Sequence, residues 1–296
     1  MNFTFLTKDQ LFGTTALEAI KKYGHEAAPT DLAIVLGSPE YESETGTSDG
    51  EPTCDYWTAT CHLGEYVSII GAYGTNAAIY PADSKETCVR PALSPAETAK
   101  IHPDKRRPAV QGVECCTYGE YPQTVVNPFL GRRLEIAYKL GKLKKDNTQY
   151  TFNATGIYEL RKPFKEQPHP VFEYRGKRYI RVIARAVNYC FYLSNGTHVK
   201  NGHPYWIKVQ PVEYLKDPTG WWVARRCLLT GIEFNNDFYK GDFSKTFMKR
   251  YLDTYFAKES LASRQKSKKR QKPRTITVHA APHKAFPNCC RMQNEH

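Results

Sequence analysis

The residues of this chain that could carry out chemistry are nine cysteines, nine histidines and many acidic side chains. Three motifs that would organise them do not occur in the sequence: the HExxH zinc motif, the phosphate-binding loop and the glycine-rich dinucleotide fingerprint. Cys115 and Cys116 are neighbours on a predicted strand, so their side chains point to opposite faces and do not easily hold one ion. We therefore predict a protein that binds a partner and is not an enzyme, with no cofactor.

A second set of metal-ligand residue types lies near the C-terminus, where imidazole and thiolate side chains would suit zinc. Their spacing matches no standard zinc module, so we expect no metal there and keep a zinc clip as the alternative. Cys54, Cys61 and His62 also lack a metal-ligand spacing, and we expect them to be packing or loop residues. The C-terminal set consists of His279, His283, Cys289, Cys290 and His296.

The nine cysteines are an odd number, and the N-terminus shows no basic region followed by a long apolar run. The sequence also has no stretch of about 18 apolar residues that would span a membrane. These features favour a cytoplasmic protein whose thiols are free and serve mostly as small buried hydrophobic groups.

The positive charge is concentrated at the C-terminus. The formal net charge is +12, and residues 262–296 contain nine Lys or Arg and one Glu, which leaves +4 for residues 1–261. A basic run without acids predicts an extended segment that contacts RNA or DNA phosphates in a salt-dependent way. A solvated tail and a tail that docks on an acidic protein are the alternatives. The run comprises Arg264, Lys266, Lys268, Lys269, Arg270, Lys272 and Arg274.

The remaining composition, with 41% hydrophobic and 13% aromatic residues, is globular and excludes a disordered, collagen-like or coiled-coil chain. Residues 3–37 predict two helices, the first capped by Thr7 with Gln10 and the second by Thr30 or Asp31. Residues 38–54 predict a long exposed loop. Short aromatic and β-branched segments over residues 56–80 predict strands with tight turns.

The second half of the chain is richer in strand signals. Residues 114–126 predict a strand broken by a turn at Pro122, and residues 132–145 are ambiguous between helix and strand. Hairpin turns are expected at Arg175-Gly176 and Asn195-Gly196.

Two further strands and a helix follow. The strands are expected over residues 205–215 and 220–229, and the helix over residues 242–261. An aromatic stripe at a spacing of four is expected to turn this helix towards the core. The stripe consists of Phe243, Phe247, Tyr251 and Tyr255.

Two groups of residues carry a resemblance to a known family. The first group is Tyr56-Trp57, residues 61–88 and Arg90-Pro91-Ala92-Leu93, and the second is residues 118–123 and 210–214. The first group is similar to the second half, and the second group to the first half, of a family of C-type-lectin-like domains of bacteria and their phages. That family is related to the formylglycine-generating-enzyme fold and to the variable proteins of diversity-generating retroelements.

In that family the two halves occur in the opposite order, so the resemblance implies a circularly permuted domain. We expect one α+β domain over residues 1–261, with a C-type-lectin-like mixed antiparallel sheet, flanking helices and a basic tail over residues 262–296. Residues 3–93 would be the usual second half and residues 113–261 the usual first half, joined by residues 94–112. Two separate domains are the alternative.

The resemblance also implies a binding surface on the strands and loops before Arg90. Tyr and Trp offer large contact area at low entropic cost, and Asn offers adaptable hydrogen bonds. We expect this aromatic loop surface to contact a protein or nucleoprotein partner, and packing of the same side chains in the core is the alternative. Its residues are Tyr56, Trp57, His62, Tyr66, Tyr73, Asn76 and Tyr80.

Two narrower functions also remain open. The family setting and the basic tail are compatible with a phage-encoded inhibitor of a CRISPR-type host defence nuclease, bound at the nucleic-acid channel of that enzyme. The resemblance to formylglycine-generating enzymes suggests a metal-dependent oxidase. Those enzymes hold copper with a pair of cysteines, and this sequence has no pair in matching positions.

Overall fold

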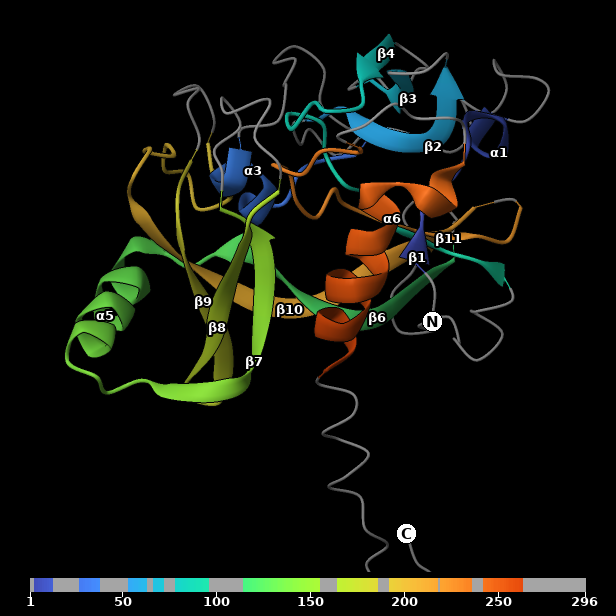
Figure 1. The fold of residues 1–296 in the computed structure, drawn as a ribbon. Coiled ribbons are helices and arrows are strands. Elements are labelled where there is room, and N and C mark those ends of the chain that lie inside the picture. The colour runs from blue at the N-terminus through green and yellow to red at the C-terminus, as the bar shows by residue number, and fades with distance from the viewer. Residues whose placement is uncertain are drawn as a thin grey trace, which may run out of the picture.

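The computed structural model describes residues 3–12, 27–37, 53–62, 66–71, 78–95, 114–154, 164–185, 192–217, 219–235 and 242–262. These residues form a mixed α+β structure with mostly antiparallel sheets, which confirms the predicted class at that level (Figure 1). The basic run 264–274 and residues 38–52 of the predicted loop lie outside the described residues. Thr53 and Cys54, which end that loop, are fully buried, so the exposed loop does not extend to them.

The larger sheet has eight strands within the described residues, in the order β1-β5-β11-β10-β9-β8-β7, with β6 also paired to β10. All of its strand pairs are antiparallel. The strands are β1 (Phe3–Thr4), β5 (Ala92–Leu93), β6 (Cys115–Val125), β7 (Lys144–Asn153), β8 (Glu166–Tyr174), β9 (Lys177–Ile183), β10 (Pro204–Lys216) and β11 (Trp222–Ala224).

Segments from the two ends of the chain meet in this sheet. Phe3 in β1 pairs with Leu93 in β5, and Ala92 in β5 pairs with Val223 in β11. The opening ninety-five residues therefore extend a sheet that the later part of the chain begins, and both parts share its hydrophobic core.

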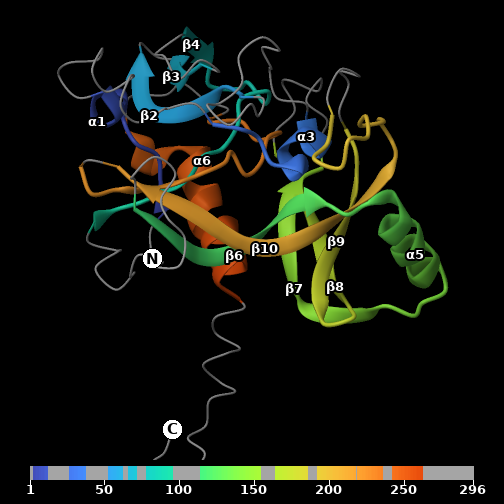
Figure 2. The same cartoon turned by 180° about the vertical axis from the view of Figure 1, so that it is seen from behind.

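A smaller sheet covers one end of the molecule and contains β2 (Tyr56–His62), β3 (Tyr66–Ile70) and β4 (Ala78–Pro81) (Figures 1 and 2). All three strands fall where aromatic and β-branched residues predict them, so this prediction is confirmed. In strand β3 the first residue, Tyr66, is exposed, and Val67 to Ile70 are all buried, so buried and exposed positions do not alternate along this strand.

The predicted hairpin turn at Arg175-Gly176 is confirmed. Both residues have positive φ angles, 52° and 72°, as a two-residue turn between twisted antiparallel strands requires. At Asn195-Gly196 the turn is also present, but it closes a single bridge between Tyr192 and His198 instead of a strand pair.

The expected break at Pro122 is wrong, because β6 runs through it without a turn. Irregular pairing with β10 absorbs the proline, with register shifts between Lys208 and Val209 and between Pro211 and Glu213. Within the described residues β6 pairs only with β10, so the missing N–H of Pro122 does not interrupt hydrogen bonding to a second strand.

The two described helices of the N-terminal region, α1 and α3, begin where their caps predict. Helix α1 (Lys8–Phe12) follows a capping box in which the Thr7 amide donates to Gln10 Oε1 at 2.8 Å and the Gln10 amide donates to Thr7 Oγ1 at 3.2 Å. Helix α3 (Asp31–Gly37) follows Thr30, whose hydroxyl accepts from the Ala33 amide at 3.3 Å. Residues 3 and 4, which precede the Thr7 cap at the start of the segment assigned to helices, form β1.

The ambiguous segment 132–145 divides into helix and strand. Helix α5 (Pro128–Lys139) begins with proline at its first turn, and the Asn127 side chain accepts from the Leu130 amide at 2.8 Å. Strand β7 starts at Lys144 after a short turn. Glycine at position 141, with φ of 66°, ends the helical region.

The last helical region is less regular than predicted. It consists of η2 (Phe243–Lys245), α6 (Phe247–Tyr251), the π-helical turn η3 (Leu252–Phe256) and a final helical stretch 257–262. Wider π-helical spacing changes which side chains face inward. Tyr251 is buried as expected, whereas Phe243, Phe247 and Tyr255 are only half-buried at the edge of the core. The fully buried positions are Met248, Tyr251, Leu252 and Phe256.

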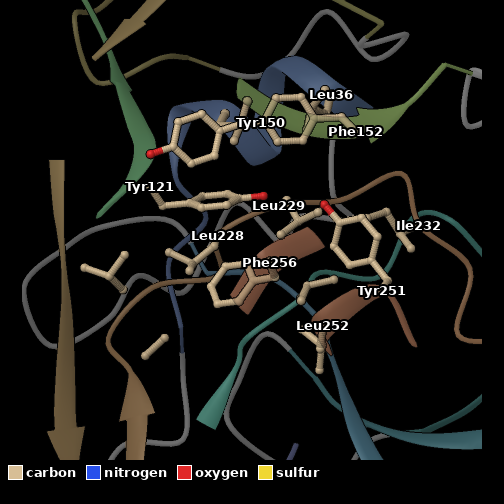
Figure 3. Close-up of a cluster of buried hydrophobic side chains, with 14 of the residues drawn as sticks. Leu36, Tyr121, Tyr150, Phe152, Leu228, Leu229, Ile232, Tyr251, Leu252 and Phe256 are labelled. Atoms are coloured by element: carbon tan, nitrogen blue, oxygen red, sulfur yellow. The ribbon is translucent and has the colours of Figure 1, made fainter. Parts of the chain in front are cut away.

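Phe256 is the point where three distant segments meet in the core (Figure 3). Its ring lies 4.8 Å from Phe3 in an edge-to-face arrangement and 4.9 Å from Tyr121 of β6. Tyr121 in turn packs edge-to-face on Tyr150 of β7 at 5.2 Å. Such aromatic pairs add to the stabilisation that burial of apolar area provides.

Replacing Phe256 by alanine should lower the free energy of unfolding by about 3–5 kcal/mol, because it leaves a cavity among side chains from three segments. Urea denaturation of the purified protein measures the loss. The matched control is Phe129→Ala, since Phe129 is 73% exposed, and there the change should be within about 0.5 kcal/mol. Equal losses for the two variants would contradict the packing described here.

Candidate binding groove beside helix α5

Helix α5 buries one face and leaves another unpartnered. Leu134 is fully buried in a small cluster with Phe172, Tyr179 and Trp206 of the adjacent strands. On the outer face, three large apolar side chains are 51% to 73% exposed, and their spacing of seven and four residues places them on one stripe. The stripe consists of Phe129, Ile136 and Leu140.

Positive charge surrounds this stripe. Residues 128–145 contain six Lys or Arg and one Glu, so this segment carries a net charge of +5. The Arg133 guanidinium lies over the Phe129 ring, 5.5 Å from its centre. The α5 segment therefore combines exposed apolar area with a cationic border, and it lies at one side of the molecule, outside β8 and β9 (Figures 1 and 2).

A groove of about 650 Å³ runs between α5 and residues 195–206, and we call it the α5 groove. Its volume is in the range of sites that hold small ligands or peptide side chains. The floor is apolar, with Val126 and Trp206 among the lining residues. The polar and aromatic lining residues that matter for recognition are Arg132, Lys139, His198, Lys200, His203 and Tyr205.

The second wall of the groove is held in place by the tight turn at Asn195-Gly196. The Asn195 side-chain amide donates to the Val126 carbonyl at 3.1 Å, which ties the turn to the start of α5. The Tyr205 hydroxyl accepts from the Lys200 amide at 2.9 Å and donates to the His198 carbonyl at 3.3 Å. The wall is therefore pre-organised before a ligand binds.

Glu135 is the only acid among the described lining residues, and it is already paired. Arg181 donates to it twice, at 2.9 and 3.0 Å, and the Trp206 indole donates at 3.0 Å. Hydrogen bonding from Arg181 lowers the pKa of Glu135; partial burial opposes this, and the Trp206 hydrogen bond adds to it. Lys139 also lies 4.0 Å from a Glu135 oxygen, but its side chain is 72% exposed. The groove therefore presents Arg132, Lys200 and the exposed Lys139 to an incoming ligand.

Two residues of the expected aromatic loop surface are not at the surface. Tyr56 and Trp57 are 2% and 1% exposed. Trp57 packs against Phe234 at 5.4 Å, and the Tyr56 hydroxyl accepts from Arg90 at 3.0 Å. Both residues begin β2 and pack in the core. The alternative that these side chains serve core packing is therefore correct for Tyr56 and Trp57.

The rest of that surface is partly described. Tyr66 is 42% exposed at the end of β3, and Tyr80 is half-buried and packs against the core. The His62 ring is half-buried and hydrogen-bonds to the Ser68 hydroxyl. Tyr73 and Asn76 lie outside the described residues, as do the tail residues 264–274 and the C-terminal histidines and cysteines.

Sequence reasoning did not single out the α5 groove. The signal that would have found it is the segment Arg132 to Lys145, in which basic residues alternate with apolar ones at helical spacing. The partner wall at residues 195–206 carries no comparable signal, because only the fold brings it next to α5.

Two other pockets are each lined by an acidic residue whose hydrogen bonds hold segments of the fold together. The pocket of about 210 Å³ contains Asp31, whose carboxylate accepts from the Val125 amide at 2.7 Å and from the Ser194 amide at 2.8 Å. The one of about 380 Å³ contains Glu259, which accepts from the Thr151 amide at 2.8 Å and so joins the last helix to β7. Burial raises the pKa of Glu259 to about 7 despite these hydrogen bonds.

Outside the described residues, Gly46 to Gly50 have the GxSxG spacing of a nucleophile elbow. That motif requires a strand-to-helix turn, and we assign no nucleophile to Ser48 from spacing alone.

No family model, curated protein or solved structure matches the chain. In the described part of the chain, no helix has the length and apolar character needed to cross a membrane.

The ion pair beneath the groove predicts a pH dependence of stability. The folded-state pKa of Glu135 is lowered, so its stabilisation is present above the ordinary carboxylate pKa and is lost as pH falls. Glu135→Gln should therefore lower the free energy of unfolding by about 1–3 kcal/mol at pH 7 and by less at pH 4. Urea denaturation at both pH values measures this difference.

The matched control is Glu173→Gln. Glu173 faces Lys144 at 3.8 Å, with both side chains largely exposed, so its loss should cost at most about 1 kcal/mol. A Glu135→Gln variant with an unchanged pH profile would show that the pair with Arg181 does not support the groove.

Proposed function

We propose that this chain is a non-catalytic binding protein whose α5 groove takes an acidic, amphipathic segment of a protein partner. The observation that carries the proposal is the exposed stripe of Phe129, Ile136 and Leu140 beside a groove in which the one carboxylate is paired to Arg181. Apolar side chains at the centre and charges at the rim are the usual arrangement of a protein interface.

A protein segment fits this surface better than a nucleic acid. Two of the three stripe residues, Ile136 and Leu140, are aliphatic and gain little from phosphates or from stacked bases. Leucine or phenylalanine side chains of a partner would bury against them, and its carboxylates would face Arg132 and Lys139. Electrostatic complementarity of this kind raises the association rate and selects acidic partners.

The lectin-like assignment and the circular permutation stay predictions. In support of the first, β1 and β5 from the early part of the chain join the sheet of the later part. The aromatic loop surface, without Tyr56 and Trp57, stays a second candidate surface for the same partner, with Tyr66 as its most exposed described residue.

Reversing two groove charges should weaken binding of an acidic probe. We expect Arg132→Glu/Lys139→Glu to raise the Kd of a fluorescent peptide with Leu and Glu at helical spacing by at least about 10-fold. Ile136→Ala/Leu140→Ala should weaken it as well, because the aliphatic contacts are lost. Fluorescence anisotropy at physiological salt, where distant charges are screened, measures both.

The matched control is Lys245→Glu/Lys258→Glu, which makes the same change of net charge at exposed lysines outside the groove. It should leave the Kd nearly unchanged, and a peptide with Lys in place of Glu should not bind the unchanged protein. If a single-stranded RNA bound the groove more tightly than the acidic peptide, and the aliphatic substitutions had no effect, the surface would be a nucleic-acid site instead.

The basic tail is tested separately. If residues 264–274 contact phosphates, removal of residues 262–296 should abolish retention of the chain on immobilised oligouridylate RNA at low salt. Retention of the full-length chain should fall steeply as salt rises. Equal retention by the truncated chain would show that the tail does not hold RNA, and loss of that retention in Arg132→Glu/Lys139→Glu would assign it to the groove.

A further inference from the structure

Three cysteines that are far apart in the sequence form a buried cluster. Cys54, Cys88 and Cys227 are each fully buried, and their Sγ atoms all lie within 4.8 Å of one another. We call them the thiol cluster. No other described group of three or more His, Cys, Asp or Glu side chains is arranged in this way.

The backbone brings these thiols together independently of any ligand. The Cys54 amide donates to the Ala27 carbonyl at 3.0 Å, and the Cys227 amide donates to the Ala28 carbonyl at 3.0 Å. The Cys88 amide donates to the Asp55 carbonyl at 2.9 Å, next to Cys54. Three separate segments, one before β2, one before β5 and one after β11, therefore converge on one point.

The three thiols lie in a setting that opposes their ionisation. Burial raises the pKa of Cys54 and of Cys88. The Cys54 thiol donates to the Ala27 carbonyl at 3.4 Å. A cation that binds all three sulfur atoms would therefore have to replace thiol protons.

The charged neighbours define what the cluster can accept. Arg90 is 6% exposed, lies over the Tyr56 ring at 4.9 Å and donates to the Ala224 carbonyl at 2.8 Å. Burial raises the pKa of Tyr56 to about 12, so its hydroxyl stays neutral. Half-buried Asp55 adds a negative charge that raises the pKa of Cys88.

We propose that the thiol cluster is a zinc site in which Cys54, Cys88 and Cys227 ligate one Zn²⁺ through their sulfur atoms. Three Zn–S bonds form, and the S–H bond of each protonated thiol breaks, so each such thiol releases one proton to solvent as it becomes a zinc-bound thiolate. Three protein ligands leave a fourth position for a solvent molecule. Tetrahedral Zn–S bonds of about 2.3 Å place the sulfurs about 3.8 Å apart, so the cluster, whose sulfurs lie within 4.8 Å of one another, needs to contract by at most about 1 Å.

Charge distinguishes zinc from copper(I) in this setting. Three buried thiolates carry three negative charges, and Arg90 acts on Cys227 with one positive charge. A dication brings this group to neutrality, whereas a monocation leaves one negative charge, and uncompensated charge is costly in a buried site. Thiolates suit both metals, so the charge of the ion decides between them.

Zinc binding to the full chain is measured by titration calorimetry after removal of metal under reducing conditions. We expect tight binding that releases protons, seen as a dependence of the heat on the ionisation enthalpy of the buffer, and an affinity that rises with pH. Cobalt(II) in place of zinc should give thiolate-to-metal charge-transfer absorption. Cys88→Ser should weaken zinc binding at least about 100-fold.

Two controls isolate the cluster. Cys116→Ser changes a buried cysteine outside it and should leave this zinc affinity unchanged. Cys289→Ser/Cys290→Ser removes the tail thiols, and the proton-releasing site should persist. Zinc binding that survives in Cys88→Ser but is lost in the tail variant would overturn the proposal.

If Cys88→Ser does not fold, the Cys289→Ser/Cys290→Ser variant decides the question. Charge-transfer absorption with cobalt together with proton release in that variant supports the site. Absence of both signals overturns the proposal. It is also overturned if protein isolated without reductant contains a disulfide within the cluster and still binds no zinc after that disulfide is reduced.

Discussion

Strand β10 is the element on which the rest of the structure depends. Over its thirteen residues it pairs with β6 along most of its length, with β9 through its first half and with β11 through its last three residues. The strand joins two parts of the molecule that share few other strand pairs: β7, β8, β9 and α5 on one side, and β11, β5 and β1 on the other. Backbone hydrogen bonding along β10 therefore sets where both candidate sites lie.

The pairing of β10 with β6 is irregular around Pro211, and a side chain replaces some of the backbone hydrogen bonds that are missing there. Pro211 has no amide proton, and register shifts occur on both sides of it. The Gln123 side chain donates to the Gln210 carbonyl at 3.1 Å and to the Pro211 carbonyl at 3.0 Å, where the ladder with β6 is irregular. This side-chain bridging keeps the half-buried Gln210 carbonyl and the exposed Pro211 carbonyl paired within the protein.

The α5 groove and the thiol cluster are built on opposite halves of this arrangement and use different physics. The groove depends on a tight turn, an ion pair and an exposed helix face, so its chemistry is electrostatic and apolar recognition at a surface. The cluster depends on burial and on backbone bonds between the segments around Ala27, Cys88 and Cys227, so its chemistry is that of soft ligands in a low-dielectric interior. Failure of one assignment would leave the other standing.

Local signals in the sequence predicted local structure well. The capping box at Thr7 and Gln10, the cap at Thr30 and the turn at Arg175-Gly176 all form as expected, because each depends on side chains a few residues apart. Predictions failed where neighbours distant in sequence intervene. Pro122 is tolerated because β6 has one described partner, and a π-helical turn in the last helix moves Phe256 inward in place of the expected stripe.

For the candidate sites, the sequence determined composition and local character, whereas the tertiary structure determined which residues come together. The sequence by itself determined the α+β class, the amphipathic and basic character of residues 128–145, and the presence of nine cysteines. Only the tertiary structure decided that Tyr56 and Trp57 are interior residues, that residues 195–206 face α5, and that Cys54, Cys88 and Cys227 meet. Their sequence separations of 34 and 139 residues leave no periodicity to detect, because the contact is created by strand pairing and burial of the whole chain.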